Sequence, residues 1–499
     1  MPRLGPPHPA DRLPLMIDLS TTSLTPDERE LLAEGRIAGV CLFGRNVVDR
    51  EQVGEYVAEL RSLAGDDLVA AIDQEGGGVV RMFDVPVPPA AMALGHADDP
   101  ALTREVAAAA ARGLRSAGIN LDFAPVADVN SNVLNPVIAD RSFGSDPDLV
   151  SRHVVAFIEG LQEEGVGATL KHFPGHGDTD VDSHLALPTV RRPLSDLRKV
   201  ELRPFQAGIR AGVAAVMSAH IVLPTLDAQR PATLSEAALA GLLREELGFD
   251  GVIVTDALDM RAISDRWPAP VAAVMSLQAG ADMPLVIGTV AEHRETLAAI
   301  DEAGAASRLD LSGPRRRIAA LARAFPGASP DPGSAWQAGD EETLARAARM
   351  GLEERGELPR LVPGSRVLLL ARDEVRASAA AQVVVRPAAP FARALDDAGV
   401  QVRHVDVEKV TEQDVPALLD GVDAALYVST TRVPPPPEEL LTAHALAAAA
   451  ENAGLPYAHV ALWNPYTADR VTGPSLVSFG FRDLQARAAA DRLVSPDAA

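Results

Sequence analysis

A short stretch of the sequence gathers residue types that transfer protons or bind metal ions. Residues 168–188 contain three His, three Asp and one Lys. A zinc site is one interpretation, because His and Asp at short spacing are common metal ligands. However, Pro174 and Gly175 separate His172 from His176 and prevent the helical pairing of a zinc protease motif, whose general-base Glu is also missing. A solvated polar loop is a second interpretation.

Acid–base chemistry is the third interpretation, and it depends on Asp182 and His184. These residues are two apart, so in an extended segment their side chains project to the same side and the carboxylate can orient the imidazole. Such a dyad can donate a proton and later withdraw one near neutral pH. The spacing favours this chemistry over a metal site.

One further carboxylate, Asp256, stands directly after the apolar run 252–255. Packing alone explains it poorly, because ionised carboxylates are almost never fully buried without a partner. It either caps the helix that follows or faces a protonatable group across a pocket, which is the pattern of glycoside hydrolysis.

The segments that position these residues alternate between short apolar runs and longer amphipathic stretches. The runs are rich in Val, Ile, Leu and Ala, as parallel strands covered on both faces are. The expected strands are 15–19, 37–43, 68–72, 119–124, 168–171, 214–218, 252–255 and 284–287, and the expected helices include 49–63, 101–117, 149–164, 194–211 and 235–246. Eight such units predict an α/β fold, a (β/α)8 TIM-like barrel. A doubly wound open sheet is the competitor, but residues 19–22 lack its Gly-rich phosphate loop.

Polar residues follow the predicted strands at their carboxyl ends, where a barrel carries its chemistry. They are Asp73, Gln74, Glu75, Asp128, Arg141, Lys171, His172, His220 and Asp256. One face of the barrel should therefore collect all of them.

A second domain is expected after the barrel. Residues 325–334 are rich in Pro, Gly and Ser, as linkers are. Beyond them, strands are predicted at 366–371, 402–405, 424–428 and 459–463, and helices at 341–353 and 438–453. We expect a catalytic barrel at 1–324, a linker at 325–340 and a smaller α/β sandwich domain at 341–499.

Composition limits the partners. The 499 residues include 46 Lys and Arg against 69 Asp and Glu, a net charge of −23 that argues against nucleic acid and anionic membrane surfaces. Aromatic residues make up only 4%, too few for a stacking platform along a polymer. The single Cys41 cannot form an internal disulfide, and no apolar run has the length of a signal peptide core or a spanning helix. We expect a cytoplasmic protein that acts on a small molecule.

Several motifs together make the sequence similar to a known family. They are AGVCLFGRN at 38–46, DQEGGGVVR at 73–81, LDFAPVAD at 121–128, RSFG at 141–144, KHFPGHGD at 171–178, DSHLALP at 182–188, VMSAH at 216–220 and LGFDG at 247–251. Over about residues 13–290 the chain resembles the β-N-acetylhexosaminidases of glycoside hydrolase family 3, the branch that removes terminal N-acetylglucosamine.

This resemblance implies a role for each matching residue. Asp256 matches the nucleophile that forms a covalent glycosyl-enzyme, and His184 the general acid/base with Asp182 as its partner. The residues matched to sugar binding are Lys171, His172 and Arg141 for the hydroxyls and the 2-acetamido group, and Asp73 and Arg81 for the non-reducing end. The resemblance therefore implies a retaining exo-β-N-acetylglucosaminidase with no metal and no organic cofactor. Its substrate would be a small β-linked glycoside such as a peptidoglycan fragment.

Two positions depart from the family pattern. The family usually has Arg where Gly78 stands and a second acidic residue where Ala257 stands, so altered substrate contacts are expected. The related β-glucosidases place Trp after the nucleophile and lack the Asp-Ser-His loop. A β-glucosidase, an N-acetylglucosaminide phosphorylase and a non-catalytic sugar-binding protein remain as alternatives. No catalytic motif lies in 340–499. The sequence leaves open whether that region is structural or narrows the leaving-group side of the substrate site. It also leaves the oligomeric state open.

Overall fold

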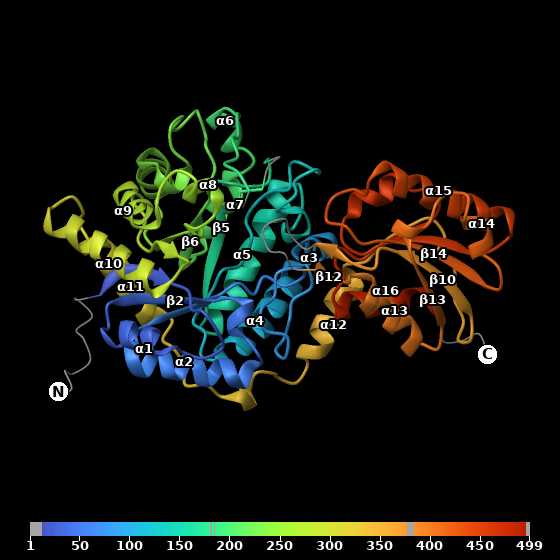
Figure 1. Ribbon diagram of the computed structural model, residues 1–499, viewed down its shortest axis with the longest axis horizontal. Coiled ribbons are helices and arrows are strands. Elements are labelled where there is room, and N and C mark those ends of the chain that lie inside the picture. Colours follow the sequence, from blue (N-terminus) through green and yellow to red (C-terminus); the bar gives the residue numbers. More distant parts are fainter. Residues whose placement is uncertain (1–11, 180–181, 184, 377–383, 496–499) are drawn as a thin grey trace.

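A computed structural model describes residues 12–179, 182–183, 185–376 and 384–495. Two α/β bodies lie side by side, and the yellow-orange segment that joins them runs beneath the first (Figure 1). The first body is built on a sheet with the strand order β7-β6-β5-β4-β3-β2-β1-β8, in which every paired neighbour is parallel. The second is built on a mixed sheet of six strands.

The first sheet closes into the predicted barrel. Its strands are β1 Leu13–Ile17, β2 Ile37–Leu42, β3 Val69–Ile72, β4 Leu121–Asp122, β5 Gly167–Phe173, β6 Ala215–Ser218, β7 Val252–Thr255 and β8 Leu285–Val286. The two ends of the order meet where Val254 bridges Met283 and the Leu258 N–H donates to the Leu285 carbonyl at 3.0 Å. The predicted fold class is therefore confirmed.

Helices cover the outside of the barrel (Figure 1). They are α1 Pro26–Ala33, α2 Arg50–Ala64, α3 Ala91–Ala97, α4 Pro100–Ser116, α5 Pro147–Glu163, α6 Leu194–Leu197, α7 Leu202–Arg210, the π-helix η5 Ala237–Glu246, α8 Arg261–Ser264, α9 Ala269–Ala279, α10 Val290–Ala305 and α11 Ser312–Ala324. Helix α5 shows why they form: Asp146 caps it by accepting from the Leu149 N–H at 2.9 Å, and Pro147 fits its first turn. Val154, Phe157 and Leu161 then face the strands at helical spacing and are buried.

The prediction of one helix over 194–211 was wrong. The structure has two helices there, α6 and α7, with a break at residues 198–201. Pro204 explains the break, because it has no N–H to donate to the carbonyl of Val200 and its ring clashes with that carbonyl in a continuous helix.

The segment between the two bodies is held against the amino-terminal end of the barrel. Asn120 donates to the Phe325 carbonyl at 2.9 Å, Arg61 to the Ala328 carbonyl at 3.3 Å, and the Asp331 N–H to the Ser116 carbonyl at 2.9 Å. Helix α12 Asp340–Met350 follows and packs on α3, α4 and the last helix of the chain. The predicted linker is therefore bound to the barrel, and the exact limits of the two domains stay a prediction.

The second sheet has the order β13 Gln401–Asp406, β10 Arg366–Ala371, β14 Ala424–Ser429, β15 Tyr457–Ala461, β16 Ser475–Val477 and β9 Glu353–Arg355. Helices α14 Val415–Leu418 and α15 Pro437–Asn452 cover one face, and α13 Ala388–Asp397 and α16 Asp483–Leu493 cover the other (Figure 1). A small hairpin pairs β11 Val375–Arg376 with β12 Val384–Val385. Strands β9 and β16 were not predicted; they pair antiparallel at the edge next to the barrel.

Across the part of the chain that the structure describes, no helix is both long and apolar enough to span a membrane.

A buried ion-pair cluster holds the barrel closed at its last strands. Asp282 lies just before β8, is fully buried, and accepts from the Ile253 N–H at 2.8 Å. It also pairs with Arg244 and, at 2.8 Å, with Arg317 of α11. One carboxylate thus joins η5 and α11 to strand β7.

Replacing this carboxylate should destabilise the fold strongly. We expect Asp282→Ala to lower the free energy of unfolding by roughly 3 kcal/mol, since it leaves two largely buried guanidinium groups uncompensated. Asp265→Ala, which removes an exposed pair with Arg261, should cost less than about 0.5 kcal/mol. Urea unfolding of both variants measures the difference, and equal losses would contradict this role for Asp282.

Candidate active site

The carboxyl end of the barrel contains a buried ammonium group between two carboxylates. Lys171 lies within β5 and is 1% exposed. Its Nζ is 2.7 Å from Oδ1 of Asp73 and 2.5 Å from Oε1 of Glu75, both of which follow β3. Arg81 returns to the same place and lies 3.3 Å from Asp73. Three of the predicted sugar-binding residues, Asp73, Arg81 and Lys171, are therefore together.

A tight turn brings Arg81 back to Asp73. Gly76 and Gly77 have φ of +94° and +51°, values that favour glycine, and a Cβ on Gly76 would lie 2.6 Å from the Pro88 carbonyl oxygen. Gln74 is fully buried, and its side-chain oxygen accepts from the Arg81 N–H at 2.9 Å. Gln74 thus fixes the loop that carries the site.

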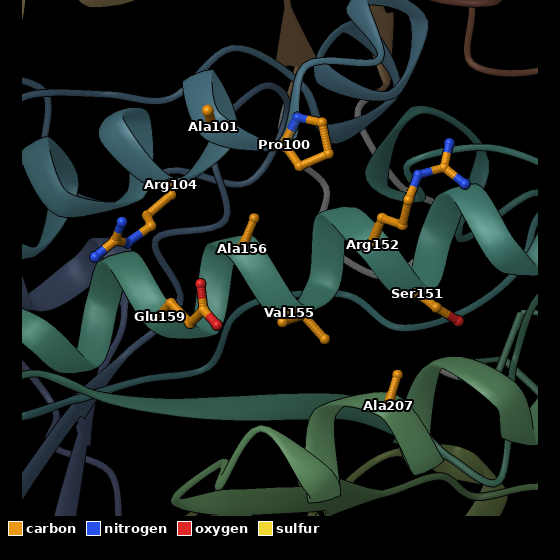
Figure 2. Close-up of a pocket in the computed structure, with 9 residues that line it drawn as sticks. All are labelled: Pro100, Ala101, Arg104, Ser151, Arg152, Val155, Ala156, Glu159 and Ala207. Atoms are coloured by element: carbon orange, nitrogen blue, oxygen red, sulfur yellow. The ribbon is translucent and has the colours of Figure 1, made fainter.

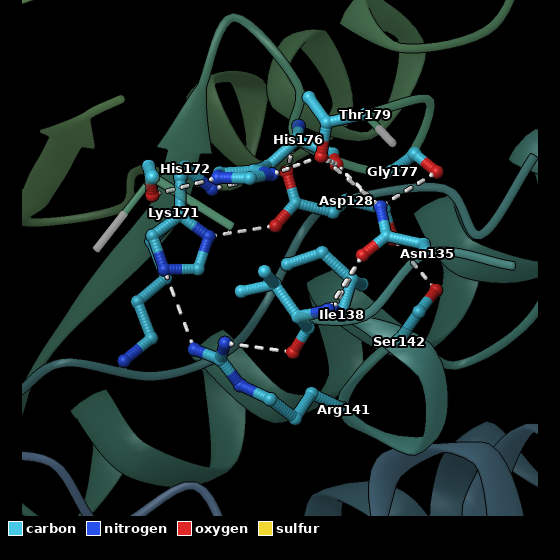
Figure 3. Close-up of polar contacts among 12 residues, drawn as sticks. Asp128, Asn135, Ile138, Arg141, Ser142, Lys171, His172, His176, Gly177 and Thr179 are labelled. Atoms are coloured by element: carbon cyan, nitrogen blue, oxygen red, sulfur yellow. Dashed lines mark hydrogen bonds and ion pairs between the residues drawn. The ribbon is translucent and has the colours of Figure 1, made fainter. Parts of the chain in front are cut away.

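Arg141 extends this network to His172. Its guanidinium binds both oxygens of Glu75 at 2.8 Å, and Nη2 lies 3.3 Å from Nε2 of His172 (Figure 3). The other ring nitrogen of His172 is 2.7 Å from Oδ2 of Asp128. The predicted residues Arg141 and His172 therefore join the same network.

Opposite charges hold the network in its ionised form. Burial alone would raise the pKa of the Glu75 carboxyl, but Arg141 and Lys171 outweigh it and hold that pKa below its ordinary value. Burial lowers the pKa of Lys171, but the carboxylates of Asp73 and Glu75 raise it by more, so the net effect is an increase. Asp73 and Asp128 have lowered pKa values because Lys171 and His172 respectively oppose the effect of their burial.

Asp128 is the centre of the next group. It is fully buried and accepts from the N–H groups of His172 at 3.2 Å and His176 at 2.7 Å. His176 continues to Thr179 Oγ1 at 2.7 Å and to Ser183 Oγ at 3.1 Å (Figure 3). Burial, with the neighbouring His172, lowers the pKa of His176 to about 4, so His176 is neutral at pH 7.

Asp256 stands half-buried at the end of β7, as predicted. Its Oδ1 accepts from the N–H of Ala257 at 2.8 Å, and its own N–H donates to the Ser218 carbonyl at 3.1 Å. The charge of Asp256 is close enough to His176 to act on its pKa, so this carboxylate belongs to the same face as the network. His220 is buried beneath it and bonds the Ala257 carbonyl through Nε2 at 2.9 Å.

The proposed dyad is described only in part. Asp182 is 8% exposed and adjoins Ser183, which bonds His176, whereas His184 lies outside the described residues. The Asp182 carbonyl accepts from the N–H groups of Leu185 at 2.9 Å and Ala186 at 3.1 Å, as in a turn. The pairing of the Asp182 and His184 side chains therefore stays a prediction, because His184 is not among the described residues.

The C-terminal region contacts this end of the barrel directly. Arg482 donates to the carbonyls of Gly77 at 3.1 Å and Gly78 at 3.4 Å. The Trp463 indole donates to Oδ1 of Asp140 at 2.9 Å, and Asn130 donates to the Tyr466 hydroxyl at 2.8 Å. We call these contacts the domain interface.

Sequence reasoning did not assign roles to several residues of the site. Gln74, Glu75, Asp128 and His220 were noted as polar residues at strand ends, and His176 was considered only as a metal ligand and as part of a motif. The role of Glu75 could have been found from its position two residues after Asp73 at the end of one strand, because this spacing brings both carboxylates close to one cation. Trp463 and Tyr466 of the domain interface lie in the stretch 460–466, which resembles a strand and turn of the family's second domain, but their contacts with the barrel were not predicted.

Within the ranges that the structure describes, no three His, Cys, Asp or Glu side chains lie close enough to share a metal ion. A hollow of about 520 Å³ lies outside the barrel between α4, α5 and α7 and is lined by residues including Arg104, Arg152 and Ala207 (Figure 2). It is remote from the strand ends that carry the buried charges.

A closed α/β barrel carries its active site at the carboxyl ends of its strands, which is where the carboxylates and cations of this chain are paired. Residues 15–321 match the family described as the glycosyl hydrolase family 3 N terminal domain. The chain therefore belongs to glycoside hydrolase family 3 and is a glycoside hydrolase.

Named relatives agree with this assignment. A β-hexosaminidase of Idiomarina loihiensis is 36% identical over 305 residues, which cover 60% of this chain and 88% of that protein. The structure of a family 3 β-N-acetylglucosaminidase from Paenibacillus sp. str. FPU-7 aligns with a TM-score of 0.86 and 32% identity over 96% of this chain and 95% of that one. NagZ from Neisseria gonorrhoeae in complex with N-trifluoroacetyl-D-glucosamine aligns at 0.59 and 32%, covering 68% of this chain and 98% of that one.

The buried neutral imidazole of His176 should make stability depend on pH. Its pKa of about 4 lies below the ordinary 6.5, so between these values the unfolded state binds a proton that the native state does not. The free energy of unfolding should fall on acidification from about pH 7 to about pH 4.5, with roughly 2.4 kcal/mol of the fall due to His176.

Urea unfolding at both pH values tests this. On acidification, the free energy of unfolding of His176→Asn should fall less than that of the wild type, by about the contribution of His176. His404→Asn, which replaces an exposed side chain, should show the same fall as the wild type. An unchanged fall in the His176 variant would contradict the assignment.

Proposed function

We propose that this protein is a retaining exo-β-N-acetylglucosaminidase that acts on small β-linked glycosides such as peptidoglycan fragments. The observation that carries the proposal is the single network of Asp73, Lys171, Glu75, Arg141 and His172 at the barrel face where Asp256 ends β7. A terminal sugar offers hydroxyls that both accept and donate hydrogen bonds, and this network presents both kinds of partner.

In this proposal the network binds one terminal sugar. The hydroxyls of the non-reducing end bind Asp73 and Arg81, and Lys171 donates to a neighbouring hydroxyl. Arg141 and His172 bind the 2-acetamido group. Because these side chains already hold one another at 2.5–3.3 Å, the pocket is ordered before the sugar binds, and little free energy is spent on arranging it.

The reaction then proceeds by double displacement. The Asp256 carboxylate attacks the anomeric carbon, the bond to the leaving oxygen breaks, and His184 gives its proton to that oxygen. Water then attacks the anomeric carbon while His184 takes a proton from it, and the bond to Asp256 breaks. Asp182 orients His184 throughout and stabilises its charged form.

The relatives support the choice of sugar. The β-hexosaminidase and β-N-acetylglucosaminidase names come from chains 36% and 32% identical to this one. The N-trifluoroacetyl-D-glucosamine complex supports a site for a 2-acylamino group. We place the reaction in the cytoplasm, which agrees with a chain whose single Cys41 is buried and unpaired. We also assign catalysis to 1–324 and an accessory role to 341–499.

A panel of aryl glycosides tests the function. We expect kcat/KM for an aryl β-N-acetylglucosaminide to exceed that for the matched β-glucoside by at least about 100-fold, because only the former uses the bonds to the acetamido group. The rate should not rise with inorganic phosphate. A preference for the glucoside would indicate a β-glucosidase, a phosphate-dependent rate would indicate a phosphorylase, and an inactive protein would indicate a sugar-binding role.

Trapping the intermediate tests the nucleophile. A fluorinated N-acetylglucosaminyl fluoride, whose glycosyl-enzyme hydrolyses slowly, should add one sugar to the peptide that contains Asp256, as measured by mass spectrometry. Asp256→Asn should abolish the label and lower kcat by at least about 1,000-fold. Asp259→Asn, on an exposed carboxylate three residues away, is the matched control and should keep the label.

A further inference from the structure

Two arginines of the C-terminal region approach the loop that follows β3, and they differ in how they are used. Arg482 donates hydrogen bonds to the carbonyls of Gly77 and Gly78, and its guanidinium carbon lies 5.0 Å from the Phe83 ring centre. Its contacts are with backbone and ring, so Arg482 holds the loop in place.

Arg432 makes a different set of contacts. Its guanidinium carbon lies 5.0 Å from the Trp463 ring centre, and its backbone carbonyl accepts from Asn464 Nδ2 at 2.6 Å. The guanidinium forms no ion pair with any residue that the structure describes, and its buried Nε has no hydrogen-bond partner among them. Arg141, by contrast, is paired with Glu75. Arg432 is thus fixed by stacking while its N–H groups remain available.

The absence of a side chain at Gly78 makes room for this guanidinium. A Cβ built on Gly78 would lie 3.6 Å from Nη2 of Arg432, 3.8 Å from Oδ2 of Asp140 and 3.9 Å from Trp463. The guanidinium of Arg432, which comes from the other domain, thus lies in contact distance of the position at which the family usually has an arginine.

The surroundings of Arg432 place it between the two halves of the site. Burial lowers the pKa of its guanidinium, and the charges of Asp140, Glu75 and Asp182 act on it as well. Glu75 belongs to the sugar-binding network and Asp182 to the segment that is expected to protonate the leaving oxygen. The side chain comes from the second domain, so it can contact a part of the substrate that the barrel residues do not bind.

We propose that Arg432 binds the leaving group of the substrate and selects those that carry a carboxylate near the scissile bond. The planar guanidinium matches a carboxylate with two parallel hydrogen bonds. The stacking on Trp463, itself anchored by Asp140, keeps the side chain in one orientation. This inference rests on the proposed function and assigns the second domain a part in specificity.

Two matched substrates test it. Both are N-acetylglucosaminyl disaccharides, identical except that the leaving sugar carries a carboxylate in one and the corresponding primary amide in the other. Arg432→Met should lower kcat/KM for the carboxylate about 10- to 100-fold, mainly through KM, and for the amide less than about 3-fold. Arg432→Lys keeps the positive charge but cannot form two parallel hydrogen bonds, so its kcat/KM for the carboxylate substrate should lie between those of the wild type and Arg432→Met.

A second-site variant separates binding from a structural effect. Gly78→Arg combined with Arg432→Met returns a guanidinium to the same place and should restore at least half of the preference for the carboxylate. Arg366→Met, which replaces an exposed arginine of the same domain paired with Asp423, should leave kcat/KM unchanged for both substrates. Equal losses on both substrates with Arg432→Met, or no loss on either, would overturn the role of Arg432. A wild type inactive on both disaccharides and on the aryl N-acetylglucosaminide would instead overturn the proposed function.

Discussion

The burial of the Lys171 ammonium is the constraint on which the site depends. A lone ammonium group in this position would lose several kcal/mol of hydration, and only the carboxylates of Asp73 and Glu75, at 2.7 and 2.5 Å, offset that loss. Both come from the end of β3, two strands away, so the pairing of β3 with β4 and of β4 with β5 must bring the three side chains to one level. The closed barrel supplies that register.

From Lys171 the contacts run outward, and each side chain fixes the next. Glu75 takes both bonds from Arg141, Arg141 meets His172, and His172 is held by Asp128. Buried polar networks of this kind are rigid when every member has a partner and costly when one is lost. The same bonds that stabilise the folded chain thus set the positions of groups that would bind a sugar.

Apolar patterning and strand ends made most of the barrel predictable. Strand β7 was predicted at its observed limits, and the polar residues at the strand ends meet on one face as expected. The break before α7 was missed although Pro204 marked it. Arg432 could not be found from sequence, since its relation to Gly78 exists only after two domains fold together.

The second domain is integrated with the barrel rather than tethered to it. The NagZ alignment covers 98% of that chain with 68% of this one, so the rest of this chain lies outside the aligned region. Here Trp463 covers Asp140, whose pKa burial raises to about 6, and Arg482 holds the loop of Gly77 and Gly78. Removing the domain would expose a buried carboxylate and release the loop that carries Asp73, Glu75 and Arg81. Gly78 belongs to this interface as well, because a Cβ at this position would lie 3.6 Å from Arg432 and 3.9 Å from Trp463.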